Sequence, residues 1–230
     1  MKIRSVFVTG TDTGIGKTRV SVALLRALVE SGVNAVGMKP VASGCEQTCD
    51  GLRNDDALAL LAAGHAPMAY DDINPFAMPE PIAPHAAALL AGATITLAPI
   101  ESAYQHLLGQ SDCVVVEGVG GWSVPLSESL MQAAIPQRLK LPVILVVGLR
   151  LGCINHALLT ARAIIADGCE LLGWIGNRID PAMAAEDQSV AMLDRLIPAP
   201  RLALLGHAET DRRESTAVGS VLSAMPVRAD

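Results

Sequence analysis

The chain has 230 residues, of which 51% are apolar and only 3% aromatic, and its formal net charge is −6. A chain this apolar is not intrinsically disordered, because it can bury enough surface to offset chain entropy. An acidic chain with few aromatic side chains argues against nucleic-acid binding, which needs clustered cations and stacking platforms. The mean hydropathy is +0.40, yet no apolar stretch approaches the roughly 20 residues of a membrane-spanning helix.

In chain order, we predict a strand at 2–8, a helix at 17–31, a strand at 34–38 and a helix at 55–63. A Pro-rich break at 78–84 precedes helices at 85–91 and 99–108, followed by strands at 112–116 and 142–147. A helix at 154–166, a strand at 171–175, a helix at 182–196, a strand at 202–205 and a helix at 216–225 complete the series.

This alternation predicts an α/β fold, a single domain with a mostly parallel β-sheet flanked by helices. The runs at 112–116 and 142–147 are nearly all β-branched, as is typical of parallel strands buried on both faces. Ligands bind such sheets at the carboxyl ends of the strands. We therefore look for function in the loops that follow each strand.

The cysteines favour a cytoplasmic protein with free thiols. There are five, an odd number, scattered through a chain large enough to need no disulfides. The first apolar run, at 5–8, is too short for a secretory signal. Cys45 and Cys49 are four residues apart and could share a metal, but no second Cys/His pair lies at ligand spacing, so we predict no metal site there.

The segment at 10–18, GTDTGIGKT, lies between a predicted strand and a predicted helix, as a P-loop requires. Its glycines let backbone N–H groups converge on phosphate oxygens at a helix amino terminus. Lys17 is expected to reach the β/γ-phosphates and Thr18 to hold Mg²⁺. The first glycine of the usual motif falls on Thr11, with Gly10 one residue earlier. The alternative is a glycine-rich turn that binds nothing.

Two further strand ends offer charged side chains. The strand at 112–116 leads into Glu117 and then a Gly-rich turn, which favours a metal-binding carboxylate over an ordinary surface glutamate. Lys39 follows the strand at 34–38 and could face phosphate or carboxylate, although an ordinary surface lysine is an equally good interpretation. Asp55 reads as a helix cap, and Asp56 as either a cap or a metal ligand.

Six segments closely resemble the dethiobiotin synthetase family in order and spacing. They are GTDTGIGKT at 10–18, GMKPVASG at 37–44, GLRNDDA at 51–57, PEPIAPH at 79–85, VEGVGGW at 116–122 and LGCINH at 151–156. The resemblance covers essentially the whole chain and implies a P-loop NTPase fold. It also implies an enzyme of biotin synthesis that forms dethiobiotin from 7,8-diaminopelargonic acid, CO₂ and ATP. A carbamate and a carbamic-phosphoric anhydride would be intermediates, and ADP and phosphate would be released.

The resemblance also implies roles for individual residues. Lys39 takes the active-site role between carbamate and γ-phosphate, and Mg²⁺ is held by Thr18, Asp56 and Glu117. The ATP-binding positions are Thr13, Gly14, Ile15, Gly16, Lys17, Thr18, Arg19, Asp56, Glu117, Gly118, Val119, Gly120, Asn177 and Arg178. The substrate-binding positions are Ser43, Gly152, Cys153, Ile154 and Asn155, the last four binding the substrate carboxylate across a homodimer interface.

One region departs from the family pattern, and three rival functions remain. The loop at 205–207 lacks the proline of the family's base-binding loop, which leaves a relaxed base preference open. A partitioning or targeting P-loop ATPase would carry an additional lysine where this chain has Thr11, Asp12 and Thr13. A cobyrinate-type amidoligase would bring a glutaminase domain, for which no room remains. A pure nucleotide-binding module would make Lys39 and the acidic residues superfluous.

Overall fold

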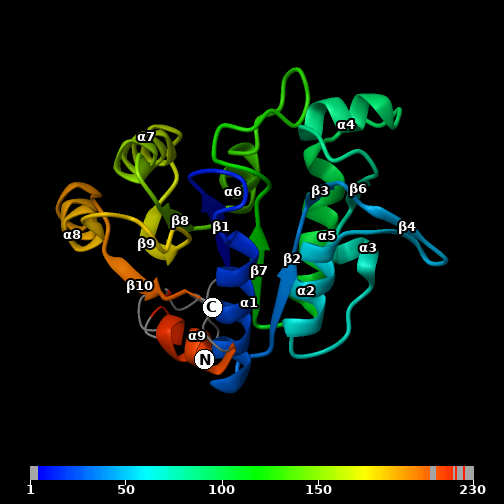
Figure 1. Cartoon of the computed structure of the whole chain (residues 1–230). Coiled ribbons are helices and arrows are strands. Elements are labelled where there is room, and N and C mark those ends of the chain that lie inside the picture. Colours follow the sequence, from blue (N-terminus) through cyan, green and yellow to red (C-terminus); the bar gives the residue numbers. More distant parts are fainter. Residues whose placement is uncertain (1–4, 208–210, 220, 222–224, 226–230) are drawn as a thin grey trace.

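A computed structural model describes residues 5–207, 211–219, 221 and 225 (Figure 1). Its centre is a parallel sheet of six strands in the order β10-β9-β8-β1-β7-β2. The strands are β1 (Val6–Gly10), β2 (Ala35–Met38), β7 (Cys113–Glu117), β8 (Val143–Leu149), β9 (Leu171–Arg178) and β10 (Arg201–Leu205). The predicted α/β class and the mostly parallel sheet are confirmed.

Helices cover both faces of the sheet (Figure 1). On one face α1 (Lys17–Glu30) packs against α9 (Asp211–Gly219), and α2 (Asp55–Ala63) packs beside α1 along β2. The helices of the other face are α5 (Leu97–Gly109), α6 (Ala134–Leu139), α7 (Cys153–Ala166) and α8 (Glu186–Leu196). In the described parts of the chain, no helix combines the length and apolarity that crossing a bilayer requires.

The strands divide the core into two layers because successive side chains of a strand point to opposite faces. In β1, Val6 and Val8 pack into the layer beneath α1, whereas Phe7 packs into the layer beneath α5 and α7. All five residues of β1 are buried. Burial on both faces explains why these strands read as continuous apolar runs in the sequence.

Several short elements beyond the β2 edge of the sheet were not predicted from the sequence. They are β3 (Val41–Ser43) paired with β6 (Phe76–Met78), the hairpin of β4 (Glu46–Thr48) and β5 (Gly51–Arg53), and the helix α3 (Tyr70–Ile73). The helix α6 was also missed, whereas the predicted helix at 85–91 is confirmed as α4 (Pro84–Leu90). Elements of three to six residues carry too few apolar positions to show a period.

The two ends of the chain were only partly predictable. The first strand begins at Val6, and residues 2–4 of the predicted strand lie outside the described residues. The last helix, predicted at 216–225, starts five residues earlier, at Asp211. Residues 220 and 222–224 of that prediction also lie outside the described residues.

Candidate functional site

The P-loop joins β1 to α1 by a turn that two glycines make feasible. Gly16 has a φ of +89°, and a Cβ there would collide with the side-chain amide of Asn177. A Cβ on Gly10 would lie 2.7 Å from Cδ1 of Ile15, whose buried side chain folds back over the strand end. This contact favours glycine at position 10.

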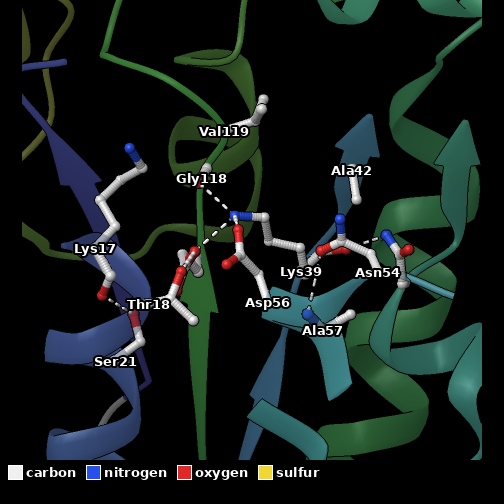
Figure 2. Close-up of polar contacts among 12 residues, drawn as sticks. Lys17, Thr18, Ser21, Lys39, Ala42, Asn54, Asp56, Ala57, Gly118 and Val119 are labelled. Carbon is white, nitrogen blue, oxygen red and sulfur yellow. Dashed lines mark hydrogen bonds and ion pairs between the residues drawn. The ribbon is translucent and has the colours of Figure 1, made fainter. Parts of the chain in front are cut away.

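The buried Lys39 contacts two carboxylates, one buried and one partly exposed (Figure 2). Its Nζ donates to Oε1 of Glu117 at 2.6 Å and to Oδ2 of Asp56 at 2.9 Å, and also to the carbonyl oxygen of Gly118 at 3.3 Å. Only 3% of Lys39 and none of Glu117 is exposed. The interpretation of Lys39 as an ordinary surface lysine is therefore wrong. The structure instead brings Lys39 next to Asp56 and Glu117, which lie 17 and 78 residues further along the sequence.

The charges of this cluster stabilise each other. Burial on its own would lower the pKa of Lys39, but the negative charges of Glu117 and Asp56 outweigh it and raise the pKa above its ordinary value. Burial would likewise raise the pKa of Asp56, but the ammonium of Lys39 lowers it below its usual range. Lys39 is thus firmly cationic and Asp56 firmly anionic at neutral pH.

The three predicted metal ligands lie together, and their donor set suits Mg²⁺. Oγ1 of Thr18 donates to Oε1 of Glu117 at 2.9 Å. Asp56 lies beside them, because the ammonium of Lys39 contacts both its carboxylate and that of Glu117. Oε2 of Glu117 is buried and has no hydrogen-bond partner among the described residues. A buried carboxylate oxygen without a partner is costly unless a cation or water meets it. Hydroxyl and carboxylate oxygens are ligands that Mg²⁺ accepts.

Lys17 contributes the second buried ammonium. Its Nζ donates to the carbonyl oxygen of Asp12 at 2.9 Å. Burial, and next the positive charge of Lys39, lower the pKa of Lys17 to about 8. The loop around it is held by the carboxylate of Asp12, which accepts from the backbone N–H of Thr13 at 2.8 Å and from Arg150 at 2.6 Å. Sequence reasoning missed both Asp12 and Arg150, because their pairing joins two strand ends 138 residues apart.

These groups face one pocket of about 400 Å³. Its walls come from the P-loop, the ends of β2 and β7, β3 and the start of α2 (Figure 2). The lining residues are Thr13, Gly14, Gly16, Lys17, Thr18, Lys39, Ala42, Ser43, Asn54, Asp56, Val119 and Gly120. Sequence reasoning named all of these as site residues except Ala42 and Asn54.

Asn54 is the residue that caps α2. Its Oδ1 accepts from the backbone N–H of Ala57 at 3.3 Å, so the cap lies one residue before the predicted Asp55. Asp55 and Asp56 occupy the first turn, where carboxylates suit the helix dipole. An Asn followed by two acidic residues is itself a helix-start signal, and it would have identified Asn54.

Asn177, Arg19 and Arg178 do not line this pocket, although the Asn177 amide packs directly behind Gly16. Nδ2 of Asn177 donates to the carbonyl oxygen of Ile15 at 2.8 Å, and its Oδ1 accepts from Arg19 at 2.7 Å. Arg19 also binds Glu214, and Arg178 is paired with Glu186 at 2.6 Å. The structure therefore gives each of these predicted nucleotide-binding side chains a partner within the chain.

The predicted substrate-binding turn begins α7. Gly152 has a φ of +94° and precedes the buried Cys153, while Leu151 is 95% exposed. Among the described residues, Gly152, Cys153, Ile154 and Asn155 are not part of the pocket lining. Their binding role stays a prediction.

Replacing Lys17 by methionine is expected to stabilise the ligand-free protein and to weaken nucleotide binding. The pKa of Lys17 is about 8 against an ordinary 10.5, so the folded state binds this proton more weakly than the unfolded state does. The resulting loss of stability is fully present below pH 8 and disappears between pH 8 and 10.5. We expect the variant to gain about 1–3 kcal/mol at pH 7 in urea denaturation. Less stability than wild type at pH 7 would contradict this.

Comparisons with known proteins identify the family. A family model described as an AAA domain matches residues 4–212. The chain is 55% identical to the ATP-dependent dethiobiotin synthetase BioD of Xanthomonas oryzae pv. oryzae (strain PXO99A), over 87% of this chain and 89% of the relative. It is 53% identical to the protein of the same name from Xylella fastidiosa (strain 9a5c), over 90% of this chain and 92% of that one.

Solved structures share the fold at much lower identity. The MinD cell division protein of Aquifex aeolicus has a TM-score of 0.58 at 14% identity, covering 98% of this chain and all of its own. A ParA family ATPase from Chlorobium tepidum TLS has a TM-score of 0.53 at 10% identity, covering 97% of this chain and 92% of its own. These likenesses concern the P-loop fold alone. The identities above 50% over most of both chains show that this chain belongs to the ATP-dependent dethiobiotin synthetase family.

Proposed function

We propose that the chain closes the ureido ring of dethiobiotin from 7,8-diaminopelargonic acid, CO₂ and ATP. The observation that carries this proposal is the burial of Lys39 against Asp56 and Glu117, in the same pocket as the P-loop. A nucleotide switch needs a phosphate loop and a metal site. In a partitioning or targeting ATPase the additional lysine would belong to the phosphate loop itself, whereas the second buried ammonium of this chain follows β2 and is paired with two carboxylates.

At the phosphate end, Lys17 and the backbone N–H groups at the start of α1 would bind the triphosphate. Thr18, Asp56 and Glu117 would hold Mg²⁺, which when bound supplies positive charge to the phosphate oxygens. Phosphoryl transfer depends mainly on positioning and on neutralising charge. A rigid cluster of charged side chains in the protein interior positions groups and neutralises charge better than mobile side chains on the surface do.

The proposed reaction has three steps. One substrate amine adds to CO₂ and loses a proton, giving a carbamate. A carbamate oxygen then attacks the γ-phosphorus of ATP, the bond to the β-phosphate oxygen breaks, and ADP leaves. The second amine attacks the carbonyl carbon of this anhydride, loses a proton, closes the ring and expels phosphate, which carries that proton away. Lys39 would lie beside the carbamate and γ-phosphate oxygens, where its charge opposes their mutual repulsion.

The far end of the substrate would bind at the turn before α7, at Gly152–Asn155. Backbone N–H groups at a helix amino terminus suit a carboxylate. We propose that this turn serves the partner's pocket in a homodimer, with the exposed Leu151 beside it contributing to the interface. We further propose that the protein works in the cytoplasm.

The test is phosphate release from Mg-ATP and bicarbonate, measured with and without 7,8-diaminopelargonic acid. We expect the diamine to stimulate phosphate release and dethiobiotin to form in equal amount. ATP hydrolysis that the diamine does not stimulate would favour a partitioning-type ATPase and would contradict the synthetase proposal.

A further inference from the structure

A second group of polar residues lies behind Lys39, where the end of β2 meets α3. Asn74 ends α3 and is only 3% exposed. Its Nδ2 donates to the backbone carbonyl oxygen of Lys39 at 2.7 Å, and the backbone N–H of Lys39 donates to the carbonyl oxygen of Ile73 at 2.7 Å. The backbone N–H and the backbone carbonyl of Lys39 are therefore both held by the end of one short helix.

Tyr70, the first residue of α3, links this anchor to α2. Its hydroxyl accepts from the backbone N–H of Asn54 at 2.8 Å and donates to Oδ1 of Asn74 at 3.3 Å. Asn54 caps the helix that carries Asp56. One hydroxyl thus connects the backbone that carries Lys39 with the helix start that carries its partner Asp56. We call Asn54, Tyr70 and Asn74 the relay.

The Tyr70 side chain is itself fixed. The guanidinium of Arg53 lies over its ring, 4.1 Å from the ring centre. Burial raises the pKa of the hydroxyl, so Tyr70 keeps the proton that it donates to Asn74. The link is therefore a neutral hydrogen-bond chain with one fixed ring at its centre.

We propose that Tyr70 and Asn74 are positioning residues that set where Lys39 lies relative to Asp56, and so relative to the reacting phosphate. The inference rests on the proposed function. A lysine has a long flexible side chain, so its ammonium is placed accurately only if its backbone and its partner are both fixed. Neither Tyr70 nor Asn74 lines the pocket. Loosening the relay is therefore expected to slow the chemical step without weakening nucleotide binding.

Tyr70→Phe tests the relay, because it removes the hydroxyl and keeps the ring beneath Arg53. Misplacing a reacting group by about 1 Å can cost 10²-fold in rate, so we expect kcat to fall at least about tenfold. The Kd for nucleotide and the KM for the diamine should stay within about twofold, since neither Tyr70 nor Asn74 lines the pocket. The matched control is Tyr104→Phe, the same change in the chain's other tyrosine, which is buried in α5. It should keep wild-type kcat.

Turnover is normalised to the concentration of nucleotide-binding sites. A partly misfolded variant is then not mistaken for one with a slower chemical step. Asn74→Asp is a second variant of near-identical shape that keeps the acceptor for Tyr70 and loses the donor to Lys39, and it should also slow kcat. The inference is overturned if both relay variants keep wild-type kcat, or if Tyr104→Phe slows turnover as much as Tyr70→Phe. A wild-type protein without diamine-dependent turnover would overturn the proposed function itself, a result distinct from either.

Discussion

Replacing Lys39 by methionine is expected to abolish turnover while nucleotide still binds. Methionine keeps much of the side-chain volume and removes the charge that faces carbamate and γ-phosphate. Removing one preorganised charge-stabilising donor costs about 10²–10³ in kcat, and we expect a loss of at least that size. Lys17, on the P-loop, stays in place to bind phosphate. The measurements are single-turnover dethiobiotin formation and the Kd for nucleotide.

Lys17→Ala is the comparison that separates the two lysines. It should weaken nucleotide binding strongly, because this ammonium lies within the phosphate loop. An equal loss of nucleotide binding in the Lys39 and Lys17 variants would contradict the division of roles between them.

The Lys39 variant should also be less stable, for a reason that can be tested separately. Glu117 is fully buried, and removal of one partner of a buried ion pair typically costs about 3–5 kcal/mol. Asp56, whose side chain is 44% exposed, should add little to this loss. A divalent cation could compensate for the missing ammonium. Mg²⁺ is therefore expected to raise the Tm of the variant more than that of wild type.

Glu117→Gln is expected to have an effect on turnover of similar size, through the metal. The amide keeps the shape of the side chain and removes the charge that Thr18 and Lys39 both contact. We expect turnover to fall about 10²–10³-fold at the Mg²⁺ concentration that saturates wild type. Raising the Mg²⁺ concentration should recover part of this loss. The measurement is a Mg²⁺ titration of dethiobiotin formation.

A matched control for the charge change is Glu101→Gln. Glu101 of α5 pairs with Arg138 of α6 at 2.9 Å in a partly exposed pair, and neither residue lines the pocket. Exposed pairs contribute little, so its Mg²⁺ titration should match wild type. A Glu117→Gln protein with a wild-type Mg²⁺ titration would show that this carboxylate does not bind the metal.

The central sheet and the phosphate end of the site were predictable from the sequence because local signals determine them. Continuous β-branched runs indicate parallel strands buried on both faces, and β7 and β8 lie within one or two residues of their predictions. Gly16, Lys17 and Thr18 form a contiguous motif whose chemistry depends on the loop itself. Glu117 was predictable because an acidic residue ended an apolar run.

Lys39 was not predictable from local signals, because its role depends on what the fold brings next to it. As a sequence, Met38-Lys39-Pro40 fits a surface turn as well as an active site. Only the positions of α2 and β7 enclose the ammonium between Asp56 and Glu117. The relay from Tyr70 was missed for the same reason, since α3 has four residues and carries no periodic pattern.

The most direct test of the account follows oxygen atoms from CO₂ to phosphate. The protein is incubated briefly with Mg-ATP, 7,8-diaminopelargonic acid and ¹⁸O-labelled bicarbonate, and the released phosphate is analysed by mass spectrometry. If a carbamate oxygen attacks the γ-phosphate beside Lys39, each phosphate carries one oxygen that came from CO₂. Phosphate released in the same reaction with oxygen from water alone would contradict the account.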